Sequence, residues 1–286
     1  MSTDTPIVYL NGQYLPVQDA QVSVLDRGFL FGDGVYEVIP VYGNKVFRFA
    51  GHMDRLRNSL SAIDIKNPCT DNEWEVLFHE LIKRNPAEGD KSLYLQITRG
   101  AGTSRDHLYS DNLQPTVFVM CRPVTPKIYD KGITAITHED IRWKYCHIKA
   151  ITLLPNIMLR QLALKTDGSS EAILIRDGLV TEGAASNVFV VKGNHVSTPP
   201  KDRTILPGVT RDLLVELLLQ AGMSCSEAPI TEQQLLNADE IWITGSLAGI
   251  APVVKLDGKP IGNGQPGSQW KAAVQLFNAY KQSYKG

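Results

Sequence analysis

Two lysines in one partly apolar segment are the first residues of this chain that suggest chemistry. Lys144 and Lys149 lie in Asp140-Ile-Arg-Trp-Lys-Tyr-Cys-His-Ile-Lys149. A lysine that has lost its proton is a nucleophile toward aldehydes and a base that moves protons. Residue type alone favours the simpler interpretation, in which both are solvated surface lysines.

Three other segments combine reactive or anion-binding groups with small residues. Glu182 lies in Val180-Thr-Glu-Gly-Ala-Ala-Ser-Asn-Val-Phe189, between two strand-like stretches. In Ile205-Leu-Pro-Gly-Val-Thr-Arg-Asp212, the residues after the glycine open a helix, whose first N–H groups form an anion site. Alternatively, Thr210 only caps that helix. The fourth segment, Phe31-Gly-Asp-Gly-Val-Tyr-Glu37, is a glycine-rich turn that enters a strand. The segments of Glu182 and of residues 31–37, each taken alone, are also explained as ordinary turns.

Other common site motifs are absent from the sequence. There is no Walker loop, no dinucleotide-binding Gly-x-Gly-x-x-Gly after a strand, no His-Glu-x-x-His and no Gly-x-Ser-x-Gly. The six histidines are scattered without zinc-ligand spacing. Plain nucleotide-binding, metal and serine-hydrolase functions therefore lack local support, and we expect no metal site.

Composition indicates an ordinary globular protein of 286 residues with a formal net charge of −1. We expect no nucleic-acid or membrane partner, because neither a basic surface nor a long apolar span is present. The four cysteines lack a Cys-x-x-Cys pair, and residues 1–6 do not resemble a signal peptide. These features predict a cytoplasmic protein.

The elements that must position these segments follow from turn signals and periodicity. Hairpins are predicted about Asn11-Gly12, Gly43-Asn44, Asp177-Gly178 and Gly193-Asn194. Strands are expected at 7–10, 13–16, 35–42, 45–48, 92–98, 116–121, 132–138, 171–176, 179–181, 187–192, 195–198, 240–244 and 253–256. Helices are expected at 53–63, 73–83, 156–165, 210–222 and 270–284.

This order of elements predicts an α+β protein with two domains. Hairpins outnumber βαβ units, which disfavours a doubly wound parallel sheet. Pro123 and Pro126 mark a linker. We therefore expect an N-terminal domain over residues 1–122, a linker over 123–127 and a β-rich C-terminal domain over 128–286.

Together, the four segments resemble the fold-type IV aminotransferase family, and most of all its bacterial D-amino-acid aminotransferases. The resemblance covers nearly the whole chain and keeps the order of the family's motifs. It implies a small α/β N-terminal domain, a larger pseudo-barrel C-terminal domain and the cofactor pyridoxal 5'-phosphate (PLP). The second domain is then the one that binds the cofactor.

The resemblance also implies roles for individual residues. Lys149 matches the catalytic lysine that bonds the cofactor and moves the proton. Glu182 matches the carboxylate that keeps the pyridine nitrogen protonated, which makes the ring an electron sink. Arg55, in His-Met-Asp-Arg-Leu, matches an arginine on the phosphate. The remaining cofactor contacts are implied for Leu206, Val209, Thr210 and Ser246.

The segment 98–107 bears on the substrate. It ends in Arg105-x-His107, and in the D-amino-acid enzymes such a pair binds the substrate carboxylate with the tyrosine that Tyr36 matches. The resemblance implies that the pair serves the neighbouring subunit of a homodimer. It further implies ping-pong transfer between a D-amino acid, such as D-alanine or D-glutamate, and a 2-oxo acid such as 2-oxoglutarate.

Other functions remain open at this stage. Branched-chain or (R)-amine transamination uses the same fold, and so does aminodeoxychorismate lyase. Arg105-x-His107 argues against the lyase. A non-catalytic binding or scaffold protein that kept the fold would lack the cofactor.

Overall fold

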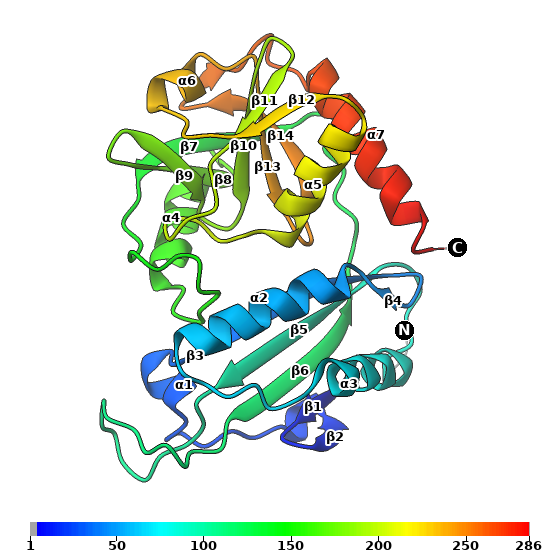
Figure 1. The fold of residues 1–286 in the computed structure, drawn as a ribbon, viewed down its shortest axis with the longest axis vertical. Coiled ribbons are helices and arrows are strands. Elements are labelled where there is room, and N and C mark those ends of the chain that lie inside the picture. The colour runs from blue at the N-terminus through cyan, green and yellow to red at the C-terminus, as the bar shows by residue number, and fades with distance from the viewer. Residues whose placement is uncertain (1–4, 286) are drawn as a thin grey trace. The chain divides into compact units, whose positions relative to one another are not determined.

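The computed structural model describes residues 5–285, which fold into two compact units (Figure 1). Unit 1 contains the chain up to Thr125, the short segment Ile148–Thr152 and the C-terminal residues from Tyr284. Unit 2 contains Pro126–His147 and Leu153–Ser283. The chain therefore leaves unit 1, returns to it briefly, and ends in it.

Within the described residues, unit 1 is built on a six-stranded antiparallel sheet in the order β2-β1-β6-β5-β3-β4. Its strands are β1 (Ile7–Leu10), β2 (Gln13–Pro16), β3 (Gly34–Tyr42), β4 (Lys45–Val46), β5 (Lys91–Thr98) and β6 (Thr116–Pro123). The predicted turn at Asn11-Gly12 is confirmed: both residues have positive φ, at 47° and 93°, as this turn type requires.

Helices cover this sheet. The 3₁₀ turn η1 (Val17–Asp19) is followed by α1 (Arg27–Phe31), α2 (Phe49–Ala62) and α3 (Asp71–Arg84). Helix α2 packs against β3, and α3 packs against β1 and β6. Their apolar faces enclose a core that includes Leu56, Trp74 and Phe78. Thr70 and Glu73 form a reciprocal capping box that starts α3.

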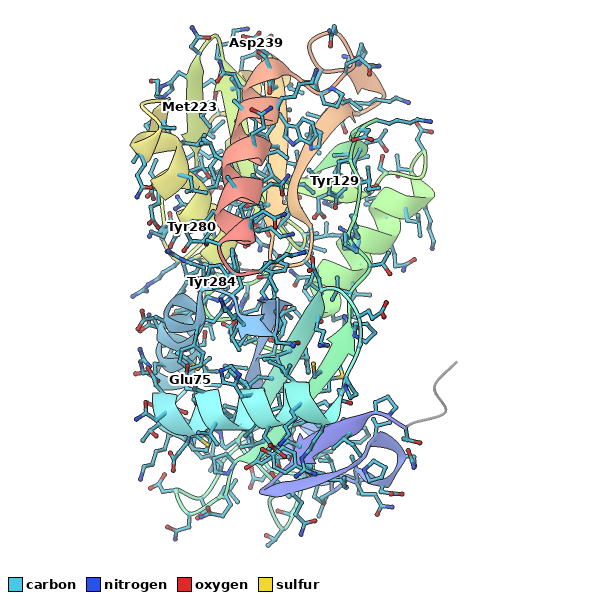
Figure 2. All side chains as sticks on the ribbon, turned by 90° about the vertical axis from the view of Figure 1, so that its right-hand side faces the viewer. Glu75, Tyr129, Met223, Asp239, Tyr280 and Tyr284 are labelled. Carbon is cyan, nitrogen blue, oxygen red and sulfur yellow. The ribbon has the colours of Figure 1, made fainter. Side chains whose placement is uncertain are left out.

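The return of the chain completes the exposed edge of β3. Tyr36 N–H donates to Lys149 O over 3.0 Å, and Ile151 N–H donates to Gly34 O over 3.1 Å. At the C-terminus, the ring of Tyr284 (Figure 2) lies 4.9 Å from that of Phe47. The predicted domains 1–122 and 128–286 place both of these segments in the second domain, because contacts between residues over 100 positions apart leave no local pattern.

Unit 2 is built on a curled mixed sheet (Figure 1). Its order is β12-β11-β10-β13-β14-β7-β8-β9, with β15 beside β14. Neighbouring strands are parallel for β11·β12, β14·β7 and β7·β8 and antiparallel elsewhere. The strands are β7 (Ile133–Glu139), β8 (Glu171–Arg176), β9 (Leu179–Gly183), β10 (Asn187–Lys192), β11 (His195–Thr198), β12 (Ser224–Glu227), β13 (Glu240–Gly245), β14 (Gly249–Leu256) and β15 (Lys259–Pro260).

The helices of unit 2 are α4 (Leu154–Lys165), α5 (Val209–Gln220), α6 (Glu232–Leu236) and α7 (Ser268–Gln282). Helix α4 packs on β7 and β8, while α5 and α7 pack on each other and on β13. The α+β class predicted from the sequence is confirmed. No helix within residues 5–285 is both long and apolar enough to cross a membrane.

The elements that differ most from the prediction are either short or begin at a different residue. Helix α1 was not predicted, because five residues that include a glycine carry no helical period. Helix α5 begins at Val209 with Gly208 as its N-cap, so the alternative role of Thr210 as that cap is wrong. Strand β14 begins four residues before the predicted 253–256.

Candidate active site

Lys149 lies on the segment that returns to unit 1. Its backbone is held on both sides: its N–H donates to Ser59 Oγ over 3.1 Å, and its carbonyl accepts from Tyr36 N–H. Its Nζ lies 4.1 Å from the centroid of the Tyr36 ring. A partly buried amine on an aromatic face is unlike the solvated surface lysine that residue type alone suggests.

In the same unit, Arg55 of α2 is paired with Glu37 of β3. Glu37 Oε1 accepts from Arg55 Nε over 2.8 Å, and Oε2 accepts from Arg55 Nη2 over 2.7 Å. His52 Nδ1 lies 2.8 Å from the same Oε2. All three side chains are buried. Burial alone would raise the pKa of Glu37, but the charge and hydrogen bonds of Arg55 and the contact with His52 lower it well below its usual value.

Glu182 is the corresponding buried acid of unit 2. It stands on β9 and forms an ion pair with Arg142 Nη1. Its Oε2 accepts from Asn187 Nδ2 and from Leu206 N–H, each over 3.0 Å. Burial raises the pKa of Glu182 to about 7, while the charge of Arg142 acts in the opposite direction. Arg142 is itself held by Asp140, which accepts two of its hydrogen bonds.

The start of α5 lies beside this acid. Asn187 Nδ2 also donates to Leu206 O over 2.8 Å, which fixes the turn before the helix. Gly208 approaches Asn187 so closely that a Cβ there would lie 1.9 Å from Asn187 Oδ1. Val209 and Thr210 form the first turn and are both buried. The first N–H groups of α5 have no intrahelical partner, as at any helix start, so this end of the helix is able to accept an anion.

The remaining predicted residues lie on turns and loops. Ser246 is half-buried in the turn after β13, and Leu206 is half-buried before α5. Arg105 and His107 are exposed on the loop between β5 and β6. Unit 1 thus holds Tyr36, Arg55, Arg105, His107 and Lys149, and unit 2 holds Glu182, Leu206, Val209, Thr210 and Ser246.

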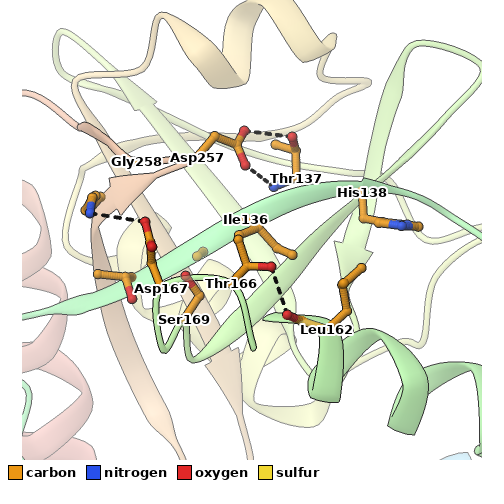
Figure 3. A pocket seen from close by; sticks show the side chains of 12 residues that line it. Ile136, Thr137, His138, Leu162, Thr166, Asp167, Ser169, Asp257 and Gly258 are labelled. Atoms are coloured by element: carbon orange, nitrogen blue, oxygen red, sulfur yellow. Dashed lines mark hydrogen bonds and ion pairs between the residues drawn. The ribbon is translucent and has the colours of Figure 1, made fainter. Parts of the chain in front are cut away.

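Two cavities are lined by none of these residues. One of about 560 Å³ lies in unit 1 against Asp26 and Phe29. The other, of about 420 Å³, lies in unit 2 beside β7 (Figure 3). There, Asp257 accepts from Thr137, and Asp167 pairs with Lys255, so the polar groups are already engaged with one another.

Comparison with known proteins identifies the family. The sequence profile of the amino-transferase class IV family matches residues 34–256. The chain belongs to this family. A D-alanine aminotransferase of Bacillus licheniformis is 41% identical to it over 262 residues, covering 91% of this chain and 92% of the relative. A D-alanine aminotransferase of Staphylococcus haemolyticus is 34% identical over 278 residues, covering 96% and 98%.

A solved structure agrees with the fold. The branched-chain aminotransferase of the archaeon Thermoproteus uzoniensis, in complex with norvaline, superposes with a TM-score of 0.86 and 27% identity. The match covers 99% of this chain and 96% of that one. The chain is therefore an aminotransferase of class IV by sequence and by fold.

Sequence reasoning missed several residues that complete the candidate site. Glu37, His52 and Asn187 were not singled out, although each is buried and hydrogen-bonded to a predicted residue or its partner. Arg142 appeared only as part of the motif around Lys149. A charged residue inside an otherwise apolar strand, as Glu37 is in β3, is the one local signal that would have found one of them.

Proposed function

We propose that this chain is a PLP-dependent aminotransferase that transfers the amino group between a D-amino acid and a 2-oxo acid. D-alanine or D-glutamate would be the donor and 2-oxoglutarate the acceptor, in a ping-pong reaction. The observation that carries the proposal is the Lys149 amine on the Tyr36 ring, in a chain of the class IV family. The D-alanine aminotransferases among its relatives support the choice of substrate.

The residues present fit PLP. An aldehyde that carries a phosphate needs an amine and an anion site, and the start of α5 supplies the latter. The lack of a Cβ at Gly208 leaves room for Asn187, whose side chain holds the turn before that helix start. Thr244 Oγ1, buried two residues before Ser246, has no hydrogen-bond partner among residues 5–285. Thr210, Ser246 and Val209 would hold the phosphate, Arg55 would add charge, and Leu206 would pack on the ring.

The chain's own residues would divide the proton transfers between them. When bound, PLP supplies an aldehyde that bonds amines and a ring that accepts the electron pair left at the substrate Cα. Lys149 would hold this aldehyde through its amine until the substrate amine takes its place, and the freed amine would then remove the Cα proton and return it, as base and then as acid. Glu182 keeps the ring nitrogen protonated, and Arg142 and Asn187 hold its carboxylate in place.

We also propose that the chain works as a homodimer in the cytoplasm. Helix α4 exposes Leu154, Ile157 and Met158, which lie on one face at helical spacing. A contiguous apolar face of this kind suits burial against a second copy. Arg105 and His107 would then bind the substrate carboxylate in the partner's site, together with Tyr36. The thiols of all four cysteines are free, which supports a reducing compartment.

Branched-chain transamination is the second candidate. It is favoured by the TM-score of 0.86 to a branched-chain aminotransferase. The exposed Arg105 and His107 favour the D-amino-acid reaction, because they offer a cationic pair to a carboxylate.

A panel of donors tests the proposal. The purified protein with PLP and 2-oxoglutarate is given D-alanine, D-glutamate, L-alanine, L-leucine or an (R)-amine, and the keto product is measured. We expect turnover with the two D-amino acids and little with the L-enantiomers. Preference for L-leucine would replace the proposal with the second candidate, and inactivity with every donor would refute both.

A further inference from the structure

Arg27 of α1 is buried beneath the loop that carries Arg105 and His107. The loop, residues 102–115, contains no helix or strand, and both of these side chains are exposed. Arg27, by contrast, is only 7% exposed. A loop without regular structure needs contacts from below to hold exposed side chains in fixed directions.

The Arg27 guanidinium donates to three consecutive carbonyls of this loop. Nη1 donates to Asp106 O over 2.6 Å and to Leu108 O over 3.4 Å, and Nη2 donates to His107 O over 3.0 Å. Its backbone N–H also donates to Gly100 O at the base of the loop, over 2.9 Å. The guanidinium suits adjacent carbonyls because its donors form a rigid planar fork, whereas the three donors of a lysine ammonium lie on a single nitrogen.

Arg27 is in turn fixed by an acid. Asp33 Oδ2 accepts from Arg27 Nε over 2.8 Å, and the same carboxylate accepts from Arg99 Nε and Nη2. Burial acts against the charged form, but the hydrogen bonds of Arg99 and Arg27 lower the pKa of Asp33. Asp33 is thus ionised near neutral pH and binds the guanidiniums of both Arg27 and Arg99. Arg27 is therefore fixed in place and is not a solvated surface charge.

An aromatic ring joins Arg27 to the two exposed side chains. The centroid of the Phe31 ring lies 4.9 Å from the Arg27 guanidinium carbon and 5.1 Å from that of Arg105. The same ring lies 5.3 Å from the ring of His107. The backbone and the side chains of the loop are therefore both placed by α1.

We propose that Arg27 is a positioning residue for recognition of the substrate carboxylate, a role that rests on the proposed function. It fixes the carbonyls of residues 106–108 and so sets the directions in which Arg105 and His107 point. Arg27 does not touch the substrate. Its loss leaves the chemistry at Lys149 intact and weakens the hold on the carboxylate.

Steady-state kinetics of Arg27→Met and Arg27→Lys test this role. Because misplaced binding groups cost about 10²-fold when displaced by about 1 Å, we expect KM for D-alanine and for 2-oxoglutarate to rise by about tenfold to a hundredfold. The change in kcat is smaller, and cofactor affinity is unchanged. The preference for D-alanine over D-alaninamide, which lacks the carboxylate, falls by about tenfold.

Arg84→Met is the matched control. Its guanidinium also faces an aromatic ring, that of Tyr14, and also pairs with a carboxylate, but it lies on α3 against β2. We expect wild-type kinetics from it. If Arg27→Met does not fold, Arg27→Lys carries the test alone.

Three results overturn the role. The first is a normal KM in Arg27→Lys or Arg27→Met. The second is an equal loss of kcat and cofactor affinity with an unchanged preference for D-alanine, which indicates a structural residue only. The third is a wild-type protein that transaminates no carboxylate-bearing donor, which refutes the proposed function and this role with it. The first two leave the proposed function standing.

Discussion

At the scale of single residues, surroundings separate Lys149 from Lys144. Lys144 is exposed, whereas Lys149 is half-buried with its amine on the ring of Tyr36. The segment between them contains Cys146 and Ile148, whose burial turns the chain inward before Lys149. One short stretch of sequence thus holds both an ordinary lysine and the proposed catalytic one.

Replacing each lysine by alanine tests this difference. We expect Lys149→Ala to lose at least about 10²-fold in kcat, the usual contribution of a positioned acid–base group. It also loses the visible absorption of the bound cofactor, because the bond to the amine is gone. Lys144→Ala, the control, keeps both. Full activity in Lys149→Ala contradicts its assigned role.

Glu37 makes stability depend on pH. Its pKa is lowered in the folded protein, so its contribution is present above the ordinary value of 4.5 and is lost as the pH falls below it. His52 adds a second pH dependence, because burial lowers the pKa of its ring in the folded protein. Below about pH 6.5 the ring takes up a proton more readily in the unfolded chain, which removes further stability.

Glu37→Gln is expected to unfold more easily at pH 7, by about 3–5 kcal/mol, since one partner of a buried ion pair is removed. Because the variant lacks this titrating carboxyl, its free energy of unfolding should change less between about pH 5 and about pH 3 than that of the wild type. Denaturant titrations at each pH measure this. Glu75→Gln, at an exposed position of α3 (Figure 2), is the control. An identical pH profile in Glu37→Gln would exclude Glu37 as the source.

At the scale of elements, the start of α5 depends on a missing side chain. Gly208 has an ordinary φ of −71°, so alanine there strains no backbone. The added Cβ instead meets Asn187 Oδ1, and Asn187 holds both Glu182 and the carbonyl of Leu206. The requirement for glycine is therefore steric.

Gly208→Ala is expected to weaken PLP binding by about tenfold or more, as the loss of a hydrogen bond to a charged group does. Titration of the cofactor into the apoprotein, followed by its absorption, measures the change. Gly102→Ala is the control, because its Cβ meets nothing closer than 3.6 Å. Unchanged affinity in Gly208→Ala would mean that Asn187 moves aside freely.

The sequence predicted the elements well where a turn motif or a hydrophobic period lies within the element itself. The hairpin turns carry Asn-Gly, Gly-Asn or Asp-Gly, and β10 matches its predicted range of 187–192. Helix α1 lacks such a pattern, because its five residues are too few to show a helical period, and the contacts of Arg27 with Asp106 are made by residues 79 positions apart. The pairing of Glu37 with Arg55, and of Arg142 with Glu182, arises only when distant segments pack.

At the scale of the whole molecule, the proposed dimer would bury the exposed apolar face of α4 against a second copy. Ile157 is 56% exposed, although an isoleucine is usually buried. If this face packs against a second copy, the proposed role of Arg105 and His107 in the partner's site depends on that contact. A variant that breaks this contact should then lose dimer formation and substrate affinity together.

Ile157→Glu is expected to halve the mass found by light scattering and to raise KM for D-alanine, because a charge is costly in an apolar interface. Val76→Glu, at an even more exposed apolar position of α3, leaves both unchanged. A wild-type protein that is monomeric at assay concentrations, or a dimeric Ile157→Glu, contradicts the proposed interface.

The brief return of the chain to unit 1 has a consequence for synthesis. The ribosome releases the strands of the first sheet well before Ile148–Thr152, which cover the edge of β3 at Gly34 and Tyr36. Until that segment emerges, the N–H of Tyr36 lacks the carbonyl of Lys149 as its acceptor. The nascent first sheet is therefore finished by residues translated after unit 2 has begun, and a message that stops at codon 125 encodes a sheet with an open edge.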